Sequence, residues 1–196
     1  MSRPSSRDAI LERAVQLASV RGLEGLSIGG LAAATGKSKG GICAHFPSKL
    51  DLQLAVVKEA AAKFRRAVVD PALEEAAGLP RLTALVDGWF SYIEAEVFEG
   101  GCFFSNAALE LDGLDQPEVL AAVRKLYRSY LRLVEQCVAA AVERGELLAE
   151  PDPKGFVRLL HGLEAGALIG HALGEEGAYA EARKAAEGLL ARHRAP

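Results

Sequence analysis

Apolar residues recur at steps of three and four along nearly the whole chain. One stripe over residues 117–144 carries Leu120, Val123, Tyr127, Tyr130, Val134 and Cys137. A second stripe over residues 81–98 carries Leu82, Leu85, Val86, Trp89, Phe90 and Ile93. These steps match the 3.6-residue period of an amphipathic helix, and no stretch sustains the alternation of a half-buried strand. The sequence therefore predicts an all-α protein.

The composition is that of an ordinary globular protein, with 196 residues of which 50% are hydrophobic and 25% charged. No apolar run approaches the roughly 18 residues of a membrane span, and the first ten residues hold no apolar signal core. Cys43, Cys102 and Cys137 are odd in number and widely scattered, which argues against a disulfide framework and a Cys-x-x-Cys metal site. We therefore expect a cytoplasmic protein with reduced thiols and no membrane partner.

Charge is distributed unevenly along the chain. Residues 1–66 hold 11 Lys or Arg and 5 Asp or Glu, a net charge of +6, whereas residues 67–196 hold 12 and 21, a net charge of −9. A basic N-terminal third followed by an acidic remainder indicates that one end of the protein binds a polyanion. Chance clustering of solvated charges is the alternative at this point.

The glycine-rich run "GGLAAATGKSKGGICAHFPSK" contains Gly-Lys-Ser, the end of a nucleotide phosphate loop. Such a loop requires a further glycine five residues before Gly36, and Leu31 stands at that position. The residues before Leu31 also lack the β-branched run of the strand that a phosphate loop follows. The spacing and the context therefore argue against nucleotide binding.

The same run predicts two short helices separated by a tight turn. Ser27 is a suitable N-cap for a first helix that ends at Gly36. Ser38 is a suitable N-cap for a second helix, in which Ile42 and Phe46 lie four residues apart on one face and are expected to be core residues. An amphipathic helix precedes this pair and a long helix follows it. This order is the helix-turn-helix arrangement.

This region resembles the N-terminal domain of TetR-type (tetracycline-repressor-like) transcriptional regulators. The family pattern is met by Ser27, Leu31, Ala32, Gly36, Ser38, Gly40, His45, Phe46, Ser48, Lys49 and Leu52. The ordered set is specific, although it covers only the first quarter of the chain. The resemblance implies a helix-turn-helix DNA-binding domain over residues 1–49 and a helical ligand-binding and dimerisation domain over residues 50–196.

The resemblance further implies that the second helix of the pair enters the major groove of a palindromic operator in double-stranded DNA. The residues that we expect to contact DNA are Ser27, Lys37, Ser38, Lys39, Gly40, Gly41, Cys43, Ala44, His45 and Lys49. Small residues let the helix backbone approach the duplex, and the Ser, Lys and His side chains suit phosphates. A purely structural role for His45 is the alternative.

Three positions depart from the family pattern. Lys37 stands where Val is usual, Gly41 where Thr is frequent, and Cys43 where Tyr is frequent. Few side chains remain to hydrogen-bond base edges, so we expect Lys37, Lys39, close backbone approach and DNA shape to carry more of the recognition. Two adjacent glycines also disfavour a helix by about 1 kcal/mol each, which predicts that this helix frays until DNA orders it.

For the remainder of the chain, the resemblance implies a small-molecule effector, a homodimer and, most simply, a repressor. The residues expected to form a largely apolar pocket with polar handles are Trp89, Ile93, Cys102, Phe103, Asn106, Glu110, Tyr127, Tyr130, His161 and Glu164. The residues expected at the dimer interface are Leu163, Ala167, Gly170, His171, Ala182, Ala186 and Leu189. Ordinary core packing is the alternative for each aromatic residue.

Two other functions stay open on the sequence. Cys102 follows two glycines at a helix start, where backbone amides lower the pKa of a thiol, so regulation through oxidation of Cys102 is an alternative to effector binding. The alternative is that Cys102 is a buried residue of the effector pocket without a redox role. A small helical enzyme would have to use His161, Glu164 and Glu110. The sequence shows no nucleophile–base spacing, no cofactor fingerprint and no third ligand beside His161 and Glu164, so we expect no catalytic residue, cofactor or metal.

Overall fold

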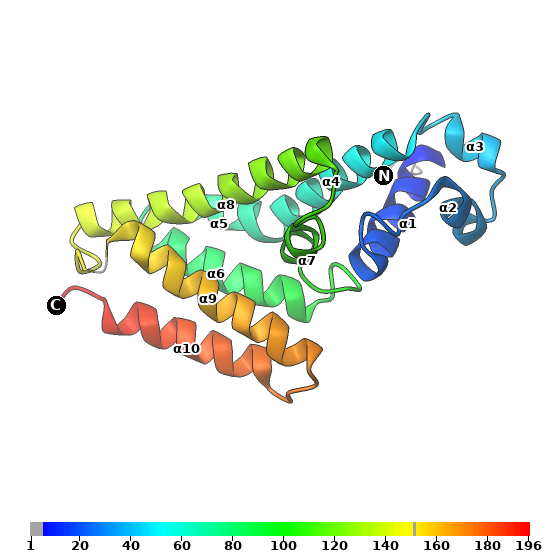
Figure 1. The fold of residues 1–196 in the computed structure, drawn as a ribbon. Helices are drawn as coiled ribbons and strands as arrows, with labels where there is room; N and C mark the ends of the chain where they lie inside the picture. The colour runs from blue at the N-terminus through cyan, green and yellow to red at the C-terminus, as the bar shows by residue number, and fades with distance from the viewer. Residues whose placement is uncertain (1–5, 151) are drawn as a thin grey trace. The chain divides into compact units, whose positions relative to one another are not determined.

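The structure is a computed structural model that describes residues 6–150 and 152–196 (Figure 1). Its helices are α1 (Ser6–Arg21), α2 (Ile28–Thr35), α3 (Lys39–Cys43), α4 (Lys49–Phe64), the π-helix η1 (Arg65–Val69), α5 (Asp70–Glu74), α6 (Leu79–Glu94), α7 (Phe103–Glu110), α8 (Pro117–Glu143), α9 (Pro153–Ala172) and α10 (Ala178–Arg192). The described residues form no strand, only an isolated bridge between Leu147 and Arg194. The all-α prediction is confirmed.

At Asp70-Pro71 the chain forms a widened helical turn and is not interrupted. Asp70-Pro71 suggests an interruption, but the chain passes from α4 through η1 directly into α5. Proline has no amide hydrogen and its ring crowds the carbonyl four residues earlier, and a wider turn accommodates both. The Arg65 guanidinium also contacts the Asp70 carboxylate at 2.7 Å, which joins the two ends of the turn.

Contacts within the chain define two compact units, each built from two segments that are far apart in the sequence. The first unit comprises the residues up to Lys63 together with Phe98–Leu126. The second unit comprises Phe64–Val97 together with Tyr127–Pro196. The functional boundary after residue 49 stays a prediction.

The first unit has an apolar core to which α1, α2, α3 and α4 all contribute. Its most deeply buried side chains include Ile10, Ala14, Leu31, Ile42, Phe46, Leu52 and Val56. Ile42 and Phe46 are thus core residues, as predicted. The loop before α7 lies directly against α1, because the Gly100 amide donates a hydrogen bond to Ser19 Oγ at 3.1 Å. A Cβ atom on Gly100 would collide with the Ser19 carbonyl, so this close approach requires glycine.

The second unit is a helical bundle in which α6 contacts η1, α5 and α10, and α10 lies along α9 (Figure 1). Its buried side chains include Leu82, Leu85, Phe90, Val138, Ala141 and Phe156. The Phe64 ring meets the rings of Tyr92 and Tyr130 edge to face, with centroids 5.2 Å and 5.0 Å apart. Such pairs stabilise a core beyond the apolar area that they bury.

Candidate nucleic-acid interface

The helix-turn-helix predicted over residues 27–46 is formed by α2 and α3. The Ser27 hydroxyl accepts a hydrogen bond from the Gly30 amide at 3.0 Å and so caps α2. Gly36 ends α2 in the left-handed conformation, with φ of 64°. The Ser38 hydroxyl caps α3 in the same way by accepting from the Gly41 amide at 3.1 Å. Both predicted caps and the glycine turn are therefore confirmed.

The two faces of α3 differ sharply. Ile42 is 0% exposed and faces the core, whereas Lys39, Gly40, Cys43 and Ala44 are exposed. A Cβ atom added at Gly40 would meet no atom within 4 Å, so the backbone is uncovered there. Apart from Lys39, the outward face of α3 thus consists of small residues that would let another molecule approach its backbone closely.

Positive charge and exposed polar groups flank this face. Lys37 and Lys39 are exposed. The backbone amide of Lys37 donates to the Ala32 carbonyl at 3.0 Å, but among the described contacts neither ammonium has a partner. His45 is half-buried, and its ring meets the Phe46 ring edge to face at 6.4 Å. The Arg7 guanidinium lies 5.2 Å from the Phe46 ring on the α1 side.

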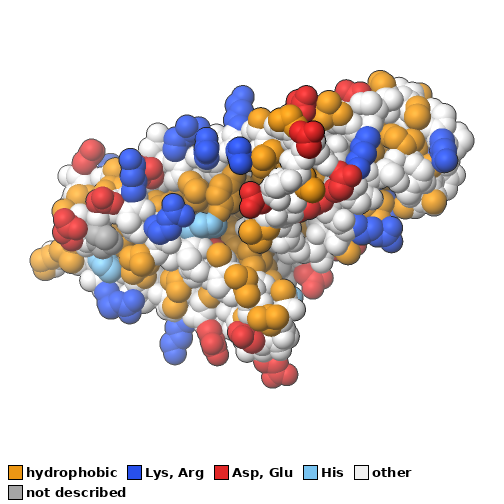
Figure 2. Space-filling view, viewed as in Figure 1, with side chains coloured by type: hydrophobic (Ala, Val, Ile, Leu, Met, Phe, Trp, Pro, Cys, Tyr) orange, Lys and Arg blue, Asp and Glu red, His pale blue; other side chains and the backbone are white. Residues whose placement is uncertain are grey.

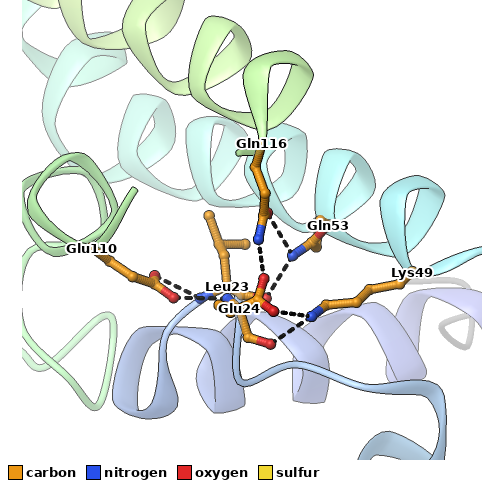
Figure 3. A network of polar contacts seen from close by, with 6 residues as sticks. All are labelled: Leu23, Glu24, Lys49, Gln53, Glu110 and Gln116. Atoms are coloured by element: carbon orange, nitrogen blue, oxygen red, sulfur yellow. Dashed lines mark hydrogen bonds and ion pairs between the residues drawn. The ribbon is translucent and has the colours of Figure 1, made fainter. Parts of the chain in front are cut away.

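Lys49 is held by a residue that the sequence did not single out. Its ammonium donates to the Glu24 carbonyl oxygen at 2.7 Å and contacts the Glu24 carboxylate at 2.9 Å (Figure 3). Its side chain is still 41% exposed. An ammonium has three hydrogens, so Lys49 retains one donor for a further partner.

The residues predicted to form one effector pocket lie in both units. Cys102, Phe103, Asn106 and Glu110 belong to the first unit, and Trp89, Ile93, Tyr127, Tyr130, His161 and Glu164 belong to the second. Within the first unit, Phe103, Asn106 and Glu110 line a cleft of about 310 Å³ together with the C-terminal end of α1.

The polar groups of this first-unit set are already engaged with the backbone. Asn106 Nδ2 donates to the Gly100 carbonyl at 2.7 Å. The Glu110 carboxylate accepts from the backbone amides of Leu23 and Glu24, at 2.8 Å and 2.7 Å. Polar side chains that already bind the backbone are poorly suited to a ligand, because a ligand would have to displace these hydrogen bonds.

The cysteines differ in accessibility. Cys43 is exposed on α3, whereas Cys102 and Cys137 are both 4% exposed. The Ser105 hydroxyl donates to Cys102 Sγ at 3.3 Å. Burial raises the pKa of the Cys137 thiol above its ordinary value, and the nearby charge of Arg81 opposes this only in part. Both buried thiols are thus shielded from reagents in solution.

In the second unit, α8 and α9 bring together three of the predicted effector residues. The Tyr127 hydroxyl contacts His161 Nε2, and His161 Nδ1 lies 3.2 Å from the Glu164 carboxylate. If Nδ1 carries the hydrogen and donates to Glu164, Nε2 accepts from Tyr127. Glu164 is only 7% exposed. Burial raises the pKa of this carboxyl above its ordinary value, while the hydrogen bond and the charge of His161 lower it.

The described residues contain neither a cluster of metal-ligating side chains nor a membrane-spanning helix. No group of three or more His, Cys, Asp or Glu side chains within them could hold a metal ion. None of the helices that they form has the length and apolar character needed to cross a lipid bilayer.

The residues predicted for a dimer interface divide between the inside and the outside of the α9–α10 pair. Ala167, Gly170, Ala186 and Leu189 are buried within the chain, where α9 and α10 pack on each other and the small residues among them allow close approach. Leu163 and Ala182 are half-buried. His171 is exposed and its ring stacks on that of Tyr179, with centroids 4.6 Å apart.

An exposed apolar stripe, none of whose residues was predicted for the dimer interface, runs along α9. Leu159, Ile169 and Leu173 are 48%, 58% and 75% exposed. Gly162 and Gly166 lie between them in the sequence, and a Cβ atom added at either would meet no atom within 4 Å. Figure 2 shows hydrophobic side chains at the surface over α9 and α10 among charged ones. The steps of three and four between these residues place them on one face of the helix.

Comparisons with known proteins identify both parts of the chain. Residues 10–56 match the family described as bacterial regulatory proteins, tetR family. Residues 78–186, more than half of the chain, match the family described as tetracyclin repressor-like, C-terminal domain.

Individual relatives agree with these families. The HTH-type transcriptional repressor AcnR of Corynebacterium glutamicum is 41% identical over 71 residues, which cover 36% of this chain and 38% of that repressor. A TetR transcriptional regulator from Chloroflexus aurantiacus has a similar structure, with a TM-score of 0.83 and 27% identity over 97% of this chain and 96% of that one.

The fold is also shared with AibR, whose structure was solved with isovaleryl coenzyme A and operator DNA. The TM-score is 0.66, with 24% identity over 81% of this chain and 83% of that one. The resemblance noted in the sequence thus extends over both domains. The chain belongs to the TetR family of DNA-binding bacterial transcriptional regulators.

Proposed function

We propose that this regulator binds a palindromic operator as a homodimer, represses transcription, and is released by a small, largely apolar effector. The observation that carries the proposal is the outward face of α3. Small residues are exposed on this face, and Ile42 on the opposite face anchors the helix in the core. An α-helix fits the major groove of B-DNA, and a helix without bulky side chains can bring its backbone close to the bases.

Phosphate contacts are assigned to the groups around α3. The amides at the starts of α2 and α3 attract anions, as helix N-termini do in general. Lys37 and Lys39 supply charge on either side of Ser38. Lys49 supplies the ammonium N–H donor that Glu24 leaves free. His45, which lies between α3 and Lys49 in the sequence, is assigned to the phosphates as well. With few side chains available for base edges, much of the sequence preference would come from DNA shape.

The dimer is assigned to the exposed stripe on α9, which consists of Leu159, Gly162, Gly166, Ile169 and Leu173. Glycines allow two helices to approach closely, and the apolar side chains around them would leave water on association. A two-fold dimer carries two reading helices and therefore suits a palindrome whose half-sites lie about one helical turn apart.

The effector is assigned to the second unit, near Tyr127, His161 and Glu164. The half-buried side chains of Tyr127 and His161 and the buried carboxyl of Glu164 form a chain of oriented polar groups, and small-molecule sites typically contain a few such groups. AibR, which shares the fold, was solved with both an acyl coenzyme A and operator DNA. The repressor function named for AcnR supports repression here.

The test is selection of bound fragments from genomic DNA by the full chain, followed by footprinting. We expect protection of a palindrome, lost when Lys37 and Lys39 are both replaced by Met and retained when the exposed Lys184 of α10 is replaced by Met. Fragments without a shared motif, or equal binding by the double variant, would contradict the proposal. Candidate effectors are then scored by whether they release the selected fragment.

A further inference from the structure

The loop between α1 and α2 presents two consecutive backbone amides to a single carboxylate. The amides of Leu23 and Glu24 donate to the two oxygens of Glu110, at 2.8 Å and 2.7 Å (Figure 3). Gly22 precedes them with φ of 79°, in the left-handed region, and a Cβ atom there would collide with the Glu110 carboxylate. Successive amides turned to one side form a small concavity that binds anions, and here α7 supplies the anion.

The same loop is held by side chains of α4 and by Gln116, just before α8. Gln53 Nε2 donates to the Leu23 carbonyl at 2.8 Å and to Gln116 Oε1 at 3.2 Å. Gln116 in turn donates to the Glu24 carboxylate, which also pairs with Lys49. These contacts, together with those of Glu110, are called the Glu110 network below. Figure 3 shows that its members approach the loop from different elements of the first unit.

The loop held in this way leads directly into the reading helices. Glu24 stands three residues before Ser27, the cap of α2. Lys49, which pairs with Glu24, is the first residue of α4. A shift of the loop would therefore move the start of α2, and with it the position of α3 relative to α4, within the first unit.

We propose that Glu110 is a positioning residue for sequence-specific DNA binding, which fixes the loop before α2 through two backbone amides and so sets the place of α3. This inference rests on the proposed operator binding and adds to it a residue remote from the reading helices in the sequence. It also gives Glu110 a role other than the effector contact expected from the sequence.

A positioning role differs measurably from a merely structural one. A residue that only stabilises the fold lowers the melting temperature and leaves the ratio of specific to non-specific binding unchanged in the molecules that remain folded. A residue that sets the place of α3 changes that ratio, because non-specific binding depends on charge and tolerates small shifts of the reading helix. Loss of an acidic residue by charge alone would strengthen binding to every duplex.

The experiment compares the wild-type chain with Glu110→Ala, Glu110→Gln and the matched control Asp112→Asn, which removes an exposed charge two residues away. Two DNA probes are used at one ionic strength: the best duplex recovered by genomic selection with the wild-type chain, and a scrambled duplex of equal length and composition. Amide hydrogen exchange at Leu23 and Glu24 reports the two hydrogen bonds directly, and thermal melting reports the fold.

In Glu110→Ala we expect faster exchange at both amides and affinity for the selected duplex reduced roughly tenfold, the scale of one misread base pair. Affinity for the scrambled duplex should change less than about twofold, the sign of an intact charged surface. Glu110→Gln should fall between Ala and the wild type, because its single carbonyl oxygen can accept from only one amide well. Asp112→Asn should leave the exchange at both amides and the ratio of the two affinities as in the wild type, because the lost charge alone acts on both duplexes alike.

Several results would overturn the inference. These are unchanged exchange at both amides, unchanged affinity for the selected duplex despite faster exchange, or equal losses on both duplexes. If Glu110→Ala does not fold, Glu110→Gln carries the same comparison. A wild-type chain that prefers no duplex would instead overturn the proposed operator binding, and the exchange rates would then show the network without a DNA role.

Discussion

The ammonium of Lys49 donates to the backbone carbonyl of Glu24 at 2.7 Å and simultaneously pairs with the carboxylate of the same residue. A flexible side chain at the first position of α4 is thereby held in one orientation before any DNA is present. Holding it in advance reduces the entropy lost when it contacts a phosphate.

Replacing Lys49 by Met should weaken binding to every duplex, because a phosphate contact is lost whatever the sequence. The plot of the logarithm of affinity against the logarithm of salt concentration should flatten by about one unit, as expected for one lost phosphate contact. Lys58→Met, an exposed lysine of the same helix, is the control and should leave the slope unchanged. A slope equal to that of the wild type in Lys49→Met would remove Lys49 from the interface.

Gly40→Ala should separate the stability of α3 from its contact with DNA. The added methyl group meets no atom of the protein within 4 Å and favours the helix, so the free energy of unfolding should be unchanged or rise by up to about 1 kcal/mol. Operator affinity should nevertheless fall, because the methyl group occupies the space that the backbone needs near the bases. Tighter binding by Gly40→Ala would show that disorder of α3, rather than close approach, limits recognition.

Fraying of α3 without DNA is checked by amide hydrogen exchange in the free protein. The helix spans only Lys39–Cys43 and contains two adjacent glycines, so its amides should exchange faster than those of α4. Addition of the selected duplex should slow them. Strong protection of α3 in the free protein would contradict this expectation.

Glu164→Gln should stabilise the protein at neutral and alkaline pH. Burial raises the pKa of Glu164 above its ordinary value of 4.5, so the folded state binds the proton more tightly than the unfolded state does. The stability that this proton brings is fully present below about pH 4.5 and is lost as the pH rises through the raised folded pKa. Gln does not titrate, so its advantage should grow with pH across that window, to the order of 1 kcal/mol.

The measurement is a series of denaturant melts from acid to alkaline pH, with the exposed Glu187→Gln of α10 as control. A stability difference between Glu164→Gln and the wild type that shrinks as the pH rises would reverse the assignment. It would mean that pairing with His161 outweighs burial and keeps this carboxylate charged.

Ile169→Glu should convert the proposed dimer into monomers. A charge at the middle of the exposed α9 stripe would have to leave water when two copies associate, and no partner is provided for it. Light scattering after size-exclusion chromatography reports the mass, and circular dichroism confirms that the helices remain. Leu148→Glu changes a similarly exposed apolar residue outside α9 and should leave the mass unaltered.

Much of the fold could be predicted from the sequence because its signals are local. Ser27, Gly36 and Ser38 specify caps and a turn by the chemistry of their own side chains, and Ile42 and Phe46 specify the buried face by spacing. The same patterns also indicate where helices begin and end. The apolar stripe over residues 117–144, for example, corresponds to α8 (Pro117–Glu143). The widened turn at Pro71 is not encoded locally in the same way, because proline more often interrupts a helix.

The parts that escaped prediction depend on contacts between distant segments. Nothing local to Glu110 indicates that its carboxylate meets amides 86 and 87 residues earlier in the chain. One signal was available at Gln53, a polar residue on the buried face of α4 that needs a partner in the core. Ala167 and Ala186 were assigned to the dimer because small residues permit close packing, and they permit it equally between α9 and α10 of one chain.

The assignment of Phe98–Leu126 to the same compact unit as the N-terminal helices bears on how such regulators exchange specificity. A recombination event that replaced only the residues up to Lys63 would bring in a loop whose two amides had evolved beside a different α7. N-terminal segments transplanted in this way should bind DNA best when residues 98–126 of the same protein are transplanted with them. The compact unit that holds the proposed DNA-reading helices is therefore discontinuous in the sequence, with residues 98–126 as its second segment.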